Sequence, residues 1–555
     1  MARLDRLAAV KEVAQIGAAV GREFSYELLS VVAGLPKEKL DDALDQLVRS
    51  ELVFCRGERL ERIYTFKHVL VRDAAYAGLL KSRRAEFHAA IANAFEQRFP
   101  DFIETEPETL AHHLTEAGLI GKAVDYWLRA GKKAAARSAN IEAIAHLQRG
   151  IEAASRLANE SDRDALELDL QFALAPCLIA TQGPASSSAM ATFTRAHELC
   201  ERLGDVPEYL QVMFWLVTAS VVRGELPQAQ EGIATLMRLA KARDDQSALL
   251  NAMRGRAMIL LFMGRIADAH REIEGAIEAF NASDERVRLA ARAAGQDAGA
   301  AALSLMSWAL WLRGHADRAR VQIEAALERA DAVEHPHTRA YVDYYASVLY
   351  ALRGEHALAL RRAERCVALS EEHGFGQWRN LARAIRGIST TMLNPSSDAL
   401  ALDEVKGAFN DYRRAGYQLG ITALDILWCP ALLLRQQPEA ALEIIEQGLI
   451  TASHNSERIF EAELYRLKAR ALLARSGAGA MADAQSLLYR AMRTAKRQEA
   501  QSLEFRAAMD LAAPWTDQGK RAEALDLLAP LHASFTEGLD TQDLREGKAL
   551  LEQRQ

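Results

Sequence analysis

The side chains that could do chemistry stand alone or in pairs, and none completes a catalytic or metal-binding motif. His112 is adjacent to His113, and one proline separates His335 from His337. Adjacent histidines point to different faces of a helix, and neither pair has a third ligand nearby, so we predict no metal site. The sequence also has no H-E-x-x-H motif, no C-x-x-C pair and no Ser/His/Asp order that would support catalysis.

A phosphate-binding loop is absent from the sequence as well. Gly-Lys dipeptides occur, but none belongs to a G-x-x-x-x-G-K-[ST] motif, whose backbone amides would hold the phosphates. They are Gly121-Lys122, Gly131-Lys132, Gly519-Lys520 and Gly547-Lys548. We therefore predict no cofactor and no enzymatic activity for this chain in isolation.

The composition favours a folded protein of a reducing compartment. The 75 acidic and 68 basic side chains are interspersed over 555 residues, without the basic block that nucleic-acid binding would need. Five cysteines are too widely separated for a disulfide framework. The N-terminus lacks the apolar core of a signal peptide, and no apolar run approaches the ~20 residues that span a bilayer. We expect a soluble, cytoplasmic protein.

A turn residue followed five positions later by alanine recurs along most of the chain. The pairs are Gly224/Ala229, Gly264/Ala269, Gly314/Ala319, Gly354/Ala359, Ser396/Ala401, Gln436/Ala441, Gly479/Ala484 and Gly519/Ala524. Successive turn residues are 40, 50, 40, 42, 40, 43 and 40 positions apart. A fixed period of this length is typical of repeat architectures, in which each repeat packs on its neighbours.

Each repeat is predicted to be a pair of helices. Four positions after the alanine a bulky apolar residue usually follows, such as Ile233 or Ile323, and a small residue often follows three positions later. This spacing marks one face of a second helix, and the apolar stretch before each turn supplies the first helix. We predict an all-α fold in which residues 101–555 form an α-solenoid of about ten or eleven helix pairs. The pairs resemble tetratricopeptide repeats, but they are longer than the usual ~34 residues.

The first hundred residues have a different pattern. Three short helical segments are followed by two apolar stretches that flank a polar turn at residues 56–59, which predicts a β-hairpin. The helical segments are Ala8–Ala18, Ser25–Ala33 and Lys37–Val48, and the hairpin strands are residues 52–55 and 63–66. Three helices and a hairpin predict a small winged-helix domain, which together with the helix that follows it occupies residues 1–100. Its third helix carries Glu38, Asp41, Asp42 and Asp45 against two basic residues, which disfavours DNA binding.

Three stretches resemble a multidomain bacterial family. They are VAQIGAAVGREFSYELL (residues 13–29), YTFKHVLVRDAAY (64–76) and SRRAEFH (82–88). In that family a class III adenylate/guanylate cyclase domain or another signalling domain precedes a STAND-type ATPase, a winged helix and a tetratricopeptide-like tail. The resemblance implies that this chain corresponds to the C-terminal half, from a truncated gene, an internal start or a split pair. It implies a non-catalytic regulatory or sensor module, with an ATPase or cyclase domain as partner.

The resemblance also implies roles for single residues. It places His68 where a histidine of related ATPases contacts the β-phosphate of bound ADP, while the alternative is a histidine that only caps a helix. Asp73 and Tyr76 are spaced for contact on the following helix, and they are candidates for interdomain contacts together with Arg83, Arg84 and His88.

Aromatic residues on the predicted first helices are candidates for a partner-binding groove. They include Trp215, Trp308, Tyr341 and Tyr344, which would anchor a protein or peptide partner if the first helices line an open concave surface. Aromatic residues at helical spacing are more often part of a core, so that alternative stays open. If a partner binds in such a groove, it would change how the winged helix holds a nucleotide domain. A winged-helix transcriptional regulator with a tetratricopeptide-like effector domain is the alternative function.

Overall fold

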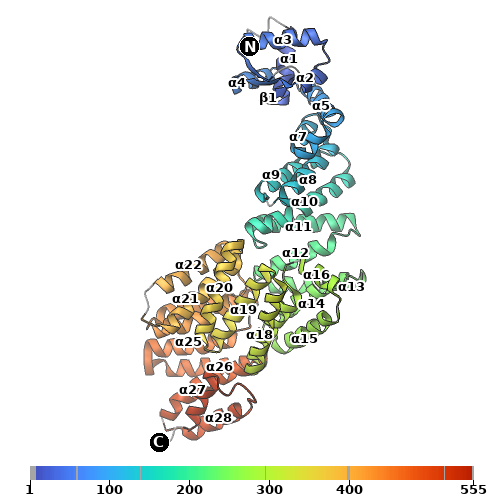
Figure 1. Cartoon of the computed structure of the whole chain (residues 1–555). Helices are drawn as coiled ribbons and strands as arrows, with labels where there is room; N and C mark the ends of the chain where they lie inside the picture. The colour runs from blue at the N-terminus through green and yellow to red at the C-terminus, as the bar shows by residue number, and fades with distance from the viewer. Residues whose placement is uncertain are drawn as a thin grey trace. The chain divides into compact units, whose positions relative to one another are not determined.

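The predicted helix pairs are present in the structure, a computed structural model that describes residues 8–57, 61–137, 139–293, 295–396, 400–517 and 519–552 (Figure 1). Contacts along the chain divide it into two units. The N-terminal unit comprises Met1–Thr181 and Ala191–Glu208, and the C-terminal unit comprises Gln182–Met190 and Tyr209–Gln555. The domain boundary predicted near residue 100 lies inside the N-terminal unit.

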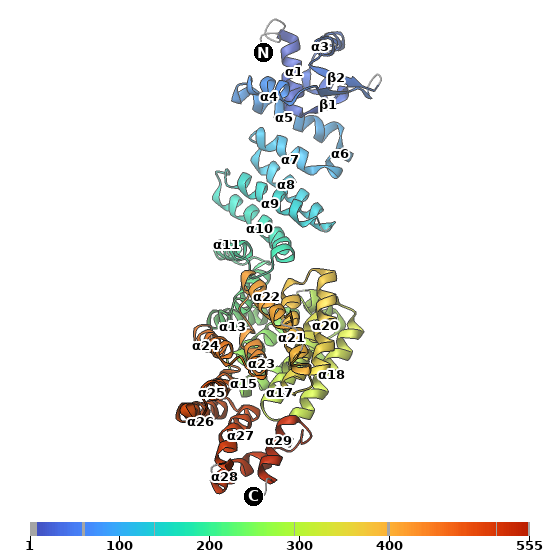
Figure 2. The same ribbon diagram turned by 90° about the vertical axis from the view of Figure 1, so that its left-hand side faces the viewer.

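The N-terminal unit begins with three helices and three short strands (Figure 2). In chain order they are α1 (Ala8–Val20), β1 (Glu23–Ser25), α2 (Tyr26–Ala33), α3 (Lys37–Arg49), β2 (Val53–Arg56) and β3 (Ile63–Phe66). β3 is the central strand and pairs antiparallel with both β1 and β2. The predicted helices and hairpin are confirmed, and the predicted turn at residues 56–59 lies partly outside the described residues. β1 was not predicted, because three residues are too few for a strand pattern.

Local chemistry explains where these elements begin and how they pack. The Ser25 hydroxyl accepts a hydrogen bond from the Leu28 amide at 3.1 Å, so the predicted serine cap begins α2. Phe24 of β1 stacks on Tyr64 of β3 with ring centroids 5.7 Å apart. Leu44 of α3 is fully buried. These contacts give the first part of the chain its own small core.

Helices form the remainder of the N-terminal unit. They are α4 (Val69–Ala77), α5 (Lys81–Arg98), α6 (Pro100–Thr105), α7 (Pro107–Glu116), α8 (Ile120–Ala136), α9 (Asn140–Ala154), α10 (Glu160–Gln182) and α11 (Ser187–Leu203), the last two reaching the residues at which the units divide. α4 packs on α1, α5 packs on α2 and α7, and α8 packs on α7 and α9. α5 therefore joins the sheet-bearing part to the first helix pairs.

The C-terminal unit is a solenoid of helix pairs. Its helices are α12 (Tyr209–Val222), α13 (Leu226–Ala242), α14 (Gln246–Phe262), α15 (Ile266–Ala282), α16 (Glu285–Ala293), α17 (Ala298–Leu312), α18 (Ala316–Val333), α19 (Pro336–Leu352), α20 (His356–His373), α21 (Gly376–Leu393), α22 (Leu400–Arg414), α23 (Ile421–Leu434), α24 (Pro438–His454), α25 (Glu461–Ser476), the 3₁₀ helix η2 (Gly477–Ala480), α26 (Met481–Gln498), α27 (Gln501–Asp517), α28 (Arg521–Ala533) and α29 (Gln542–Glu552). Each first helix packs on the second helix of its own pair and on the following pair. The tetratricopeptide-like architecture is confirmed.

The repeat pattern read from the sequence marks the packed face of the second helices. Ala229, Ala269 and Ala319 are fully buried, as are Ile273 and Ile323 four positions after the last two alanines. Small residues at these positions let neighbouring helices approach closely. Among the described residues, no helix combines the length and the apolar character that crossing a bilayer requires.

The first helices are enclosed on nearly all sides. Almost every side chain of α17, α19 and α23 is buried, whereas the second helices keep an exposed polar face. A helix that is apolar around its whole circumference must be surrounded by protein. The concave side of the solenoid is therefore filled by the first helices and is not an open channel.

Hydrogen bonds between distant pairs explain this enclosure. The Val222 carbonyl at the end of α12 accepts from the Gln418 and Leu419 amides just before α23, at 2.9 and 3.2 Å. The Phe262 carbonyl at the end of α14 accepts from the amides of residues 458 and 459 just before α25, at 2.8 and 3.0 Å. In both cases the donors belong to the pair five positions further along. One superhelical turn thus contains five helix pairs, and successive turns are in direct contact.

Two separate constraints require glycine at the turn after α14. Gly264 follows α14 with a φ of +74°, which glycine adopts without strain. A Cβ atom at this position would overlap the Gln498 side chain and lie 3.1 Å from the Arg458 carbonyl oxygen, both on the next superhelical turn. Gly374 has the same φ of +74°, but a Cβ atom added there would meet no other atom within 4 Å.

Substitution of these two glycines separates backbone strain from contact between turns. We expect Gly374→Ala to destabilise the C-terminal unit by about 1 kcal/mol, from the left-handed backbone alone. Gly264→Ala should cost about 2 kcal/mol more, because the methyl group disturbs the packing of the next turn. Urea unfolding of the two variants measures the difference, and equal losses would contradict the packing of successive turns.

Candidate functional sites

His68, the predicted nucleotide-sensing residue, lies at the surface of the N-terminal unit. It occupies the position just before α4, in an extended backbone conformation, and its ring is exposed. The ring caps no helix amide, while its carbonyl accepts from the Val71 amide at 3.0 Å. The His68 side chain therefore does not cap α4. Its imidazole lies at a surface that is open to contact by another domain.

Tyr76 and His88 form a buried polar network that the sequence did not reveal. The Tyr76 hydroxyl is hydrogen bonded to His88 Nε2 at 2.9 Å, and His88 Nδ1 is hydrogen bonded to His113 Nδ1 at 2.8 Å. Both histidines are 1% exposed. The network runs from α4 through α5 to α7, and it joins the sheet-bearing part to the first helix pairs.

Burial keeps both histidines of this network uncharged. Burial, followed by the nearby His112 and Arg84, lowers the pKa of His88 to about 4. Burial also lowers the pKa of His113 to about 3, with smaller effects from His88 and His112. One of the two Nδ1 atoms carries a proton and donates a hydrogen bond to the other. The Tyr76 hydroxyl then donates to His88 Nε2 or accepts from it, depending on which nitrogen of His88 is protonated.

The other predicted contact residues are engaged within the N-terminal unit. Arg83 on α5 forms ion pairs with Glu12 on α1 at 2.6 Å and with Glu86 at 2.7 Å. The Arg84 guanidinium lies over the Tyr76 ring, 4.6 Å from its centroid. Asp73 accepts hydrogen bonds from Arg72, its neighbour in sequence. Tyr76 thus contacts His88 and Arg84, whereas Asp73, its predicted partner, accepts hydrogen bonds from Arg72 instead.

Three of the predicted groove residues, Trp308, Tyr341 and Tyr344, lie in the core of the C-terminal unit, and Trp215 is also buried. Trp308 is fully buried, Tyr341 and Tyr344 are 2–3% exposed, and Trp215 is 8% exposed. The Trp308 indole donates to the Tyr345 carbonyl at 3.1 Å, which fixes it between α17 and α19. Trp308, Tyr341 and Tyr344 fill the space inside the superhelix, so they present no open groove to a partner. The reason is the contact between successive turns, which closes the concave side.

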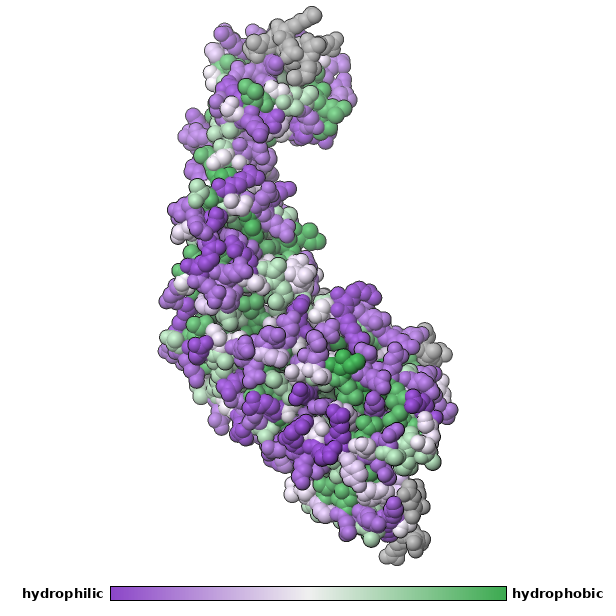
Figure 3. All heavy atoms as spheres, turned by 180° about the vertical axis from the view of Figure 1, so that it is seen from behind, coloured by the Kyte–Doolittle hydropathy of each residue, from purple (hydrophilic) through white to green (hydrophobic). Residues whose placement is uncertain are grey.

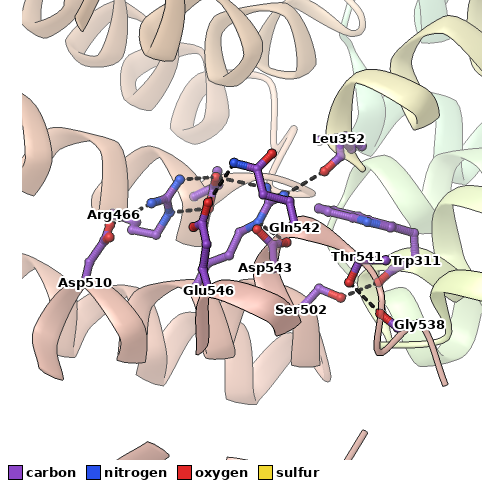
Figure 4. Close-up of polar contacts among 12 residues, drawn as sticks. Trp311, Leu352, Arg466, Ser502, Asp510, Gly538, Thr541, Gln542, Asp543 and Glu546 are labelled. Atoms are coloured by element: carbon purple, nitrogen blue, oxygen red, sulfur yellow. Dashed lines mark hydrogen bonds and ion pairs between the residues drawn. The ribbon is translucent and has the colours of Figure 1, made fainter. Parts of the chain in front are cut away.

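The C-terminal end of the solenoid is tied to the preceding turn by a cluster of arginines and carboxylates (Figure 4). Arg506 on α27 donates to Asp543 on α29 at 2.7 Å and to the Leu352 carbonyl at the end of α19, also at 2.7 Å. Its guanidinium lies 4.9 Å from the centre of the Trp311 ring. Burial raises the pKa of Glu463, but Arg466 and Arg506 outweigh this effect and lower it to about 2.

A surface cleft of about 390 Å³ lies between α13, α14 and α15. Its arginines already have carboxylate partners: Arg256 pairs with Glu272 at 3.1 Å, and Arg265 pairs with Asp268 at 2.5 Å. Figure 3 shows a face of the molecule covered mostly by hydrophilic side chains, with apolar side chains in separate groups. Among the described residues, no group of three or more His, Cys, Asp or Glu side chains is arranged to hold a metal ion.

Comparison with known proteins gives one relative in sequence. No family model matches the chain. A protein of Rhizobium meliloti (strain 1021) described as uncharacterised is 24% identical over 517 residues, which are 91% of this chain and 49% of that protein. The chain therefore spans about half the length of the relative that it matches.

Three solved structures of different proteins have an arrangement of helices similar to that of this chain. A Rap protein complexed with competence and sporulation factor has a TM-score of 0.39, with 13% identity over 78% of this chain and 99% of that one. The Cut9–Hcn1 hetero-tetramer of APC/C has a TM-score of 0.39, with 14% identity over 87% of this chain and 83% of that one. A STAND protein with a tetratricopeptide repeat sensor from Pyrococcus horikoshii has a TM-score of 0.31, with 12% identity over 98% of this chain and 65% of that one. These TM-scores and identities are too low for the function of this chain to be taken from the three structures.

The buried histidines predict that acid destabilises the N-terminal unit. Since the folded pKa values lie below the ordinary 6.5, the unfolded chain binds more protons, and stability falls as the pH drops from 6.5 towards 4. The loss should approach about 3 kcal/mol per histidine. Scanning calorimetry between pH 7 and pH 4 measures it.

The matched variants identify the source of this pH dependence. We expect His88→Gln/His113→Gln to flatten the pH dependence, whereas His68→Gln, at an exposed position, should leave it as in the unchanged protein. An unchanged slope in the double variant would assign the acid sensitivity to other groups.

Proposed function

We propose that this chain is a non-catalytic regulatory module of a signalling ATPase or adenylate cyclase. The first three helices and the sheet would be a winged-helix domain that contacts the nucleotide domain, and the C-terminal unit would bind a protein or ligand. Two observations support this beside the sequence resemblance. The elements follow the order helix, strand, helix, helix, strand, strand. The relative from Rhizobium meliloti is about twice as long as the matched segment, which leaves room in it for further domains.

The observation that carries the proposal is the apolar surface around His68. Val69 and Leu70, the first residues of α4, are 48% and 77% exposed, and Leu80 just before α5 is 78% exposed. Single exposed apolar residues are common, but two in succession beside an exposed histidine form a small apolar patch that a partner can cover. We call His68, Val69 and Leu70 the α4 surface. A neighbouring domain would cover it.

The histidine network provides a physical route from the α4 surface to the helix pairs. Tyr76 lies on α4, His88 on α5 and His113 on α7, and the three are joined by hydrogen bonds of 2.8–2.9 Å. Because these hydrogen bonds link the three helices, α4 cannot move relative to α7 without breaking them. A partner that shifts the helix pairs would thus change how the α4 surface holds its neighbour, which is a population shift between two states.

The alternative function, a transcriptional regulator, is disfavoured by the charge on α3. Glu38, Asp42 and Asp45 are exposed on this helix, the one that would enter the major groove. Their negative charges would repel DNA phosphates.

The proposal is tested by mixing the purified chain with a separately expressed ATPase or cyclase domain, taken from the sequence encoded directly upstream of it or in a neighbouring gene. We expect the chain to hydrolyse no ATP alone, to bind that partner and to change its turnover. Leu70→Glu should weaken binding about tenfold, since it places a charge in an apolar contact. Ile141→Glu is the control, because Ile141 on α9 is 82% exposed and lies outside the α4 surface.

Titration calorimetry and a turnover assay distinguish the outcomes. Equal binding by the two variants would exclude the α4 surface as the contact. A chain that neither binds the neighbouring enzyme nor changes its turnover would contradict the regulatory function. Salt-dependent binding to a DNA duplex would instead favour the transcriptional regulator.

A further inference from the structure

One buried arginine in the C-terminal unit lacks the partner that its charge requires. Arg254, Arg353 and Arg466 are buried, with 7–8% of their surface exposed. Arg353 donates to Glu355 at 2.9 Å, and Arg466 donates to Glu463 at 2.7 Å. Within the described residues, Arg254 forms no ion pair with a carboxylate, and its Nε atom has no hydrogen-bond partner.

This arrangement is costly unless an anion is bound. A guanidinium group stays charged at any physiological pH, so it cannot escape the cost of burial by losing its proton. Removing a charge from water without pairing it costs several kcal/mol. Most buried charges in proteins are therefore paired or bind a charged ligand. Arg254 is the exception among the buried arginines of the described chain.

The faces of α14 and α19 around Arg254 supply further donors. Arg254 and Met258 lie one turn apart on α14, and His337, Tyr341 and Tyr345 lie on successive turns of α19. The Tyr345 hydroxyl contacts the Met258 sulfur at 4.0 Å, which shows that these two faces meet. Arg254 also acts electrostatically on His337, Tyr341 and Tyr345, so its guanidinium lies in the same region of the core.

Two of these neighbours have donor atoms without partners. The Tyr341 hydroxyl is buried without a partner in hydrogen-bond geometry, although Arg254 and Tyr345 lie near it. His337 Nε2 accepts from the Trp378 indole at 2.9 Å, so the neutral ring carries its proton on Nδ1. Nδ1 is likewise buried without a partner in hydrogen-bond geometry, although the Gly295 backbone lies near it. Burial, with His335 and Arg254, lowers the pKa of His337 to about 4, so the ring is neutral near pH 7.

No carboxylate of the described residues forms an ion pair with Arg254. Asp297, which acts on the neighbouring His335, is already bonded to Arg329 at 2.6 and 3.0 Å. The groups around Arg254 thus offer hydrogen-bond donors and one positive charge, which no carboxylate of the described part of the chain neutralises.

We propose that Arg254, Tyr341 and His337 form a binding site for a small anion with a carboxylate or phosphate group. Arginine and hydroxyl donors suit both groups. The ligand is a small molecule, because the enclosed first helices leave no channel for a polypeptide. His337 is only partly buried as a residue, which keeps one side of the site near solvent. The site stands on its own contacts and does not require that the chain regulate another domain.

The test measures the melting temperature and heat of binding of the full chain with inorganic phosphate and with acetate, at constant ionic strength. We expect one or both anions to bind and to raise the melting temperature. Arg254→Gln should lose this response, and Tyr341→Phe, which removes only the hydroxyl, should weaken binding about tenfold. Arg256→Gln is the control, because Arg256 is two residues away on α14, its side chain is 45% exposed and it pairs with Glu272.

The two anions distinguish a phosphate ligand from a carboxylate ligand. Equal responses of all the proteins would reflect a general salt effect and would overturn the site, as would no response in the unchanged chain. Loss of binding in Arg256→Gln alone would place the anion in the surface cleft instead. Should Arg254→Gln fail to fold, Tyr341→Phe decides the matter. Regulation of a neighbouring enzyme is measured separately, so failure of either proposal can be recognised without the other.

Discussion

Backbone hydrogen bonds between successive superhelical turns determine the architecture of the C-terminal unit. The carbonyls of Val222 and Phe262 each accept two amide donors from the pair five positions further along. This contact brings one turn against the next and encloses the first helices. It also explains why a turn such as Gly264 has no room for a side chain. The arginine cluster around Arg506 continues the same contact to the end of the chain.

The enclosure changes where binding can occur. An open tetratricopeptide-like solenoid would offer its aromatic first helices to a peptide, but here Trp308 and Tyr341 are part of the core. Protein partners are left with the second helices, the ends of the solenoid and the α4 surface. The anion site proposed around Arg254 needs room only for a small ligand, and Arg254 is buried without a carboxylate partner among the described residues.

The helix pairs could be predicted because each is encoded in a local pattern of turn residue, alanine and apolar face. The number of pairs per turn could not, since it depends on the angles at which many side chains allow the pairs to stack. The type of turn residue indicates part of this stacking. Glycine stands at position 264, where the next superhelical turn is in contact, whereas glutamine stands at position 436, beside the exposed Leu434. The sequence also pairs His113 with His112, while its bonded partner His88 is 25 residues away, a separation that no spacing rule covers.

Amide hydrogen exchange at residues 418–419 and 458–459 tests the contact between turns most directly. These amides precede their helices and donate to the Val222 and Phe262 carbonyls of the preceding turn, so this contact is what protects them. If the turns are joined, these amides exchange as slowly as the amides inside the adjoining helices. Exchange at the rate of an unprotected loop would mean that the turns are not joined and that the solenoid is open.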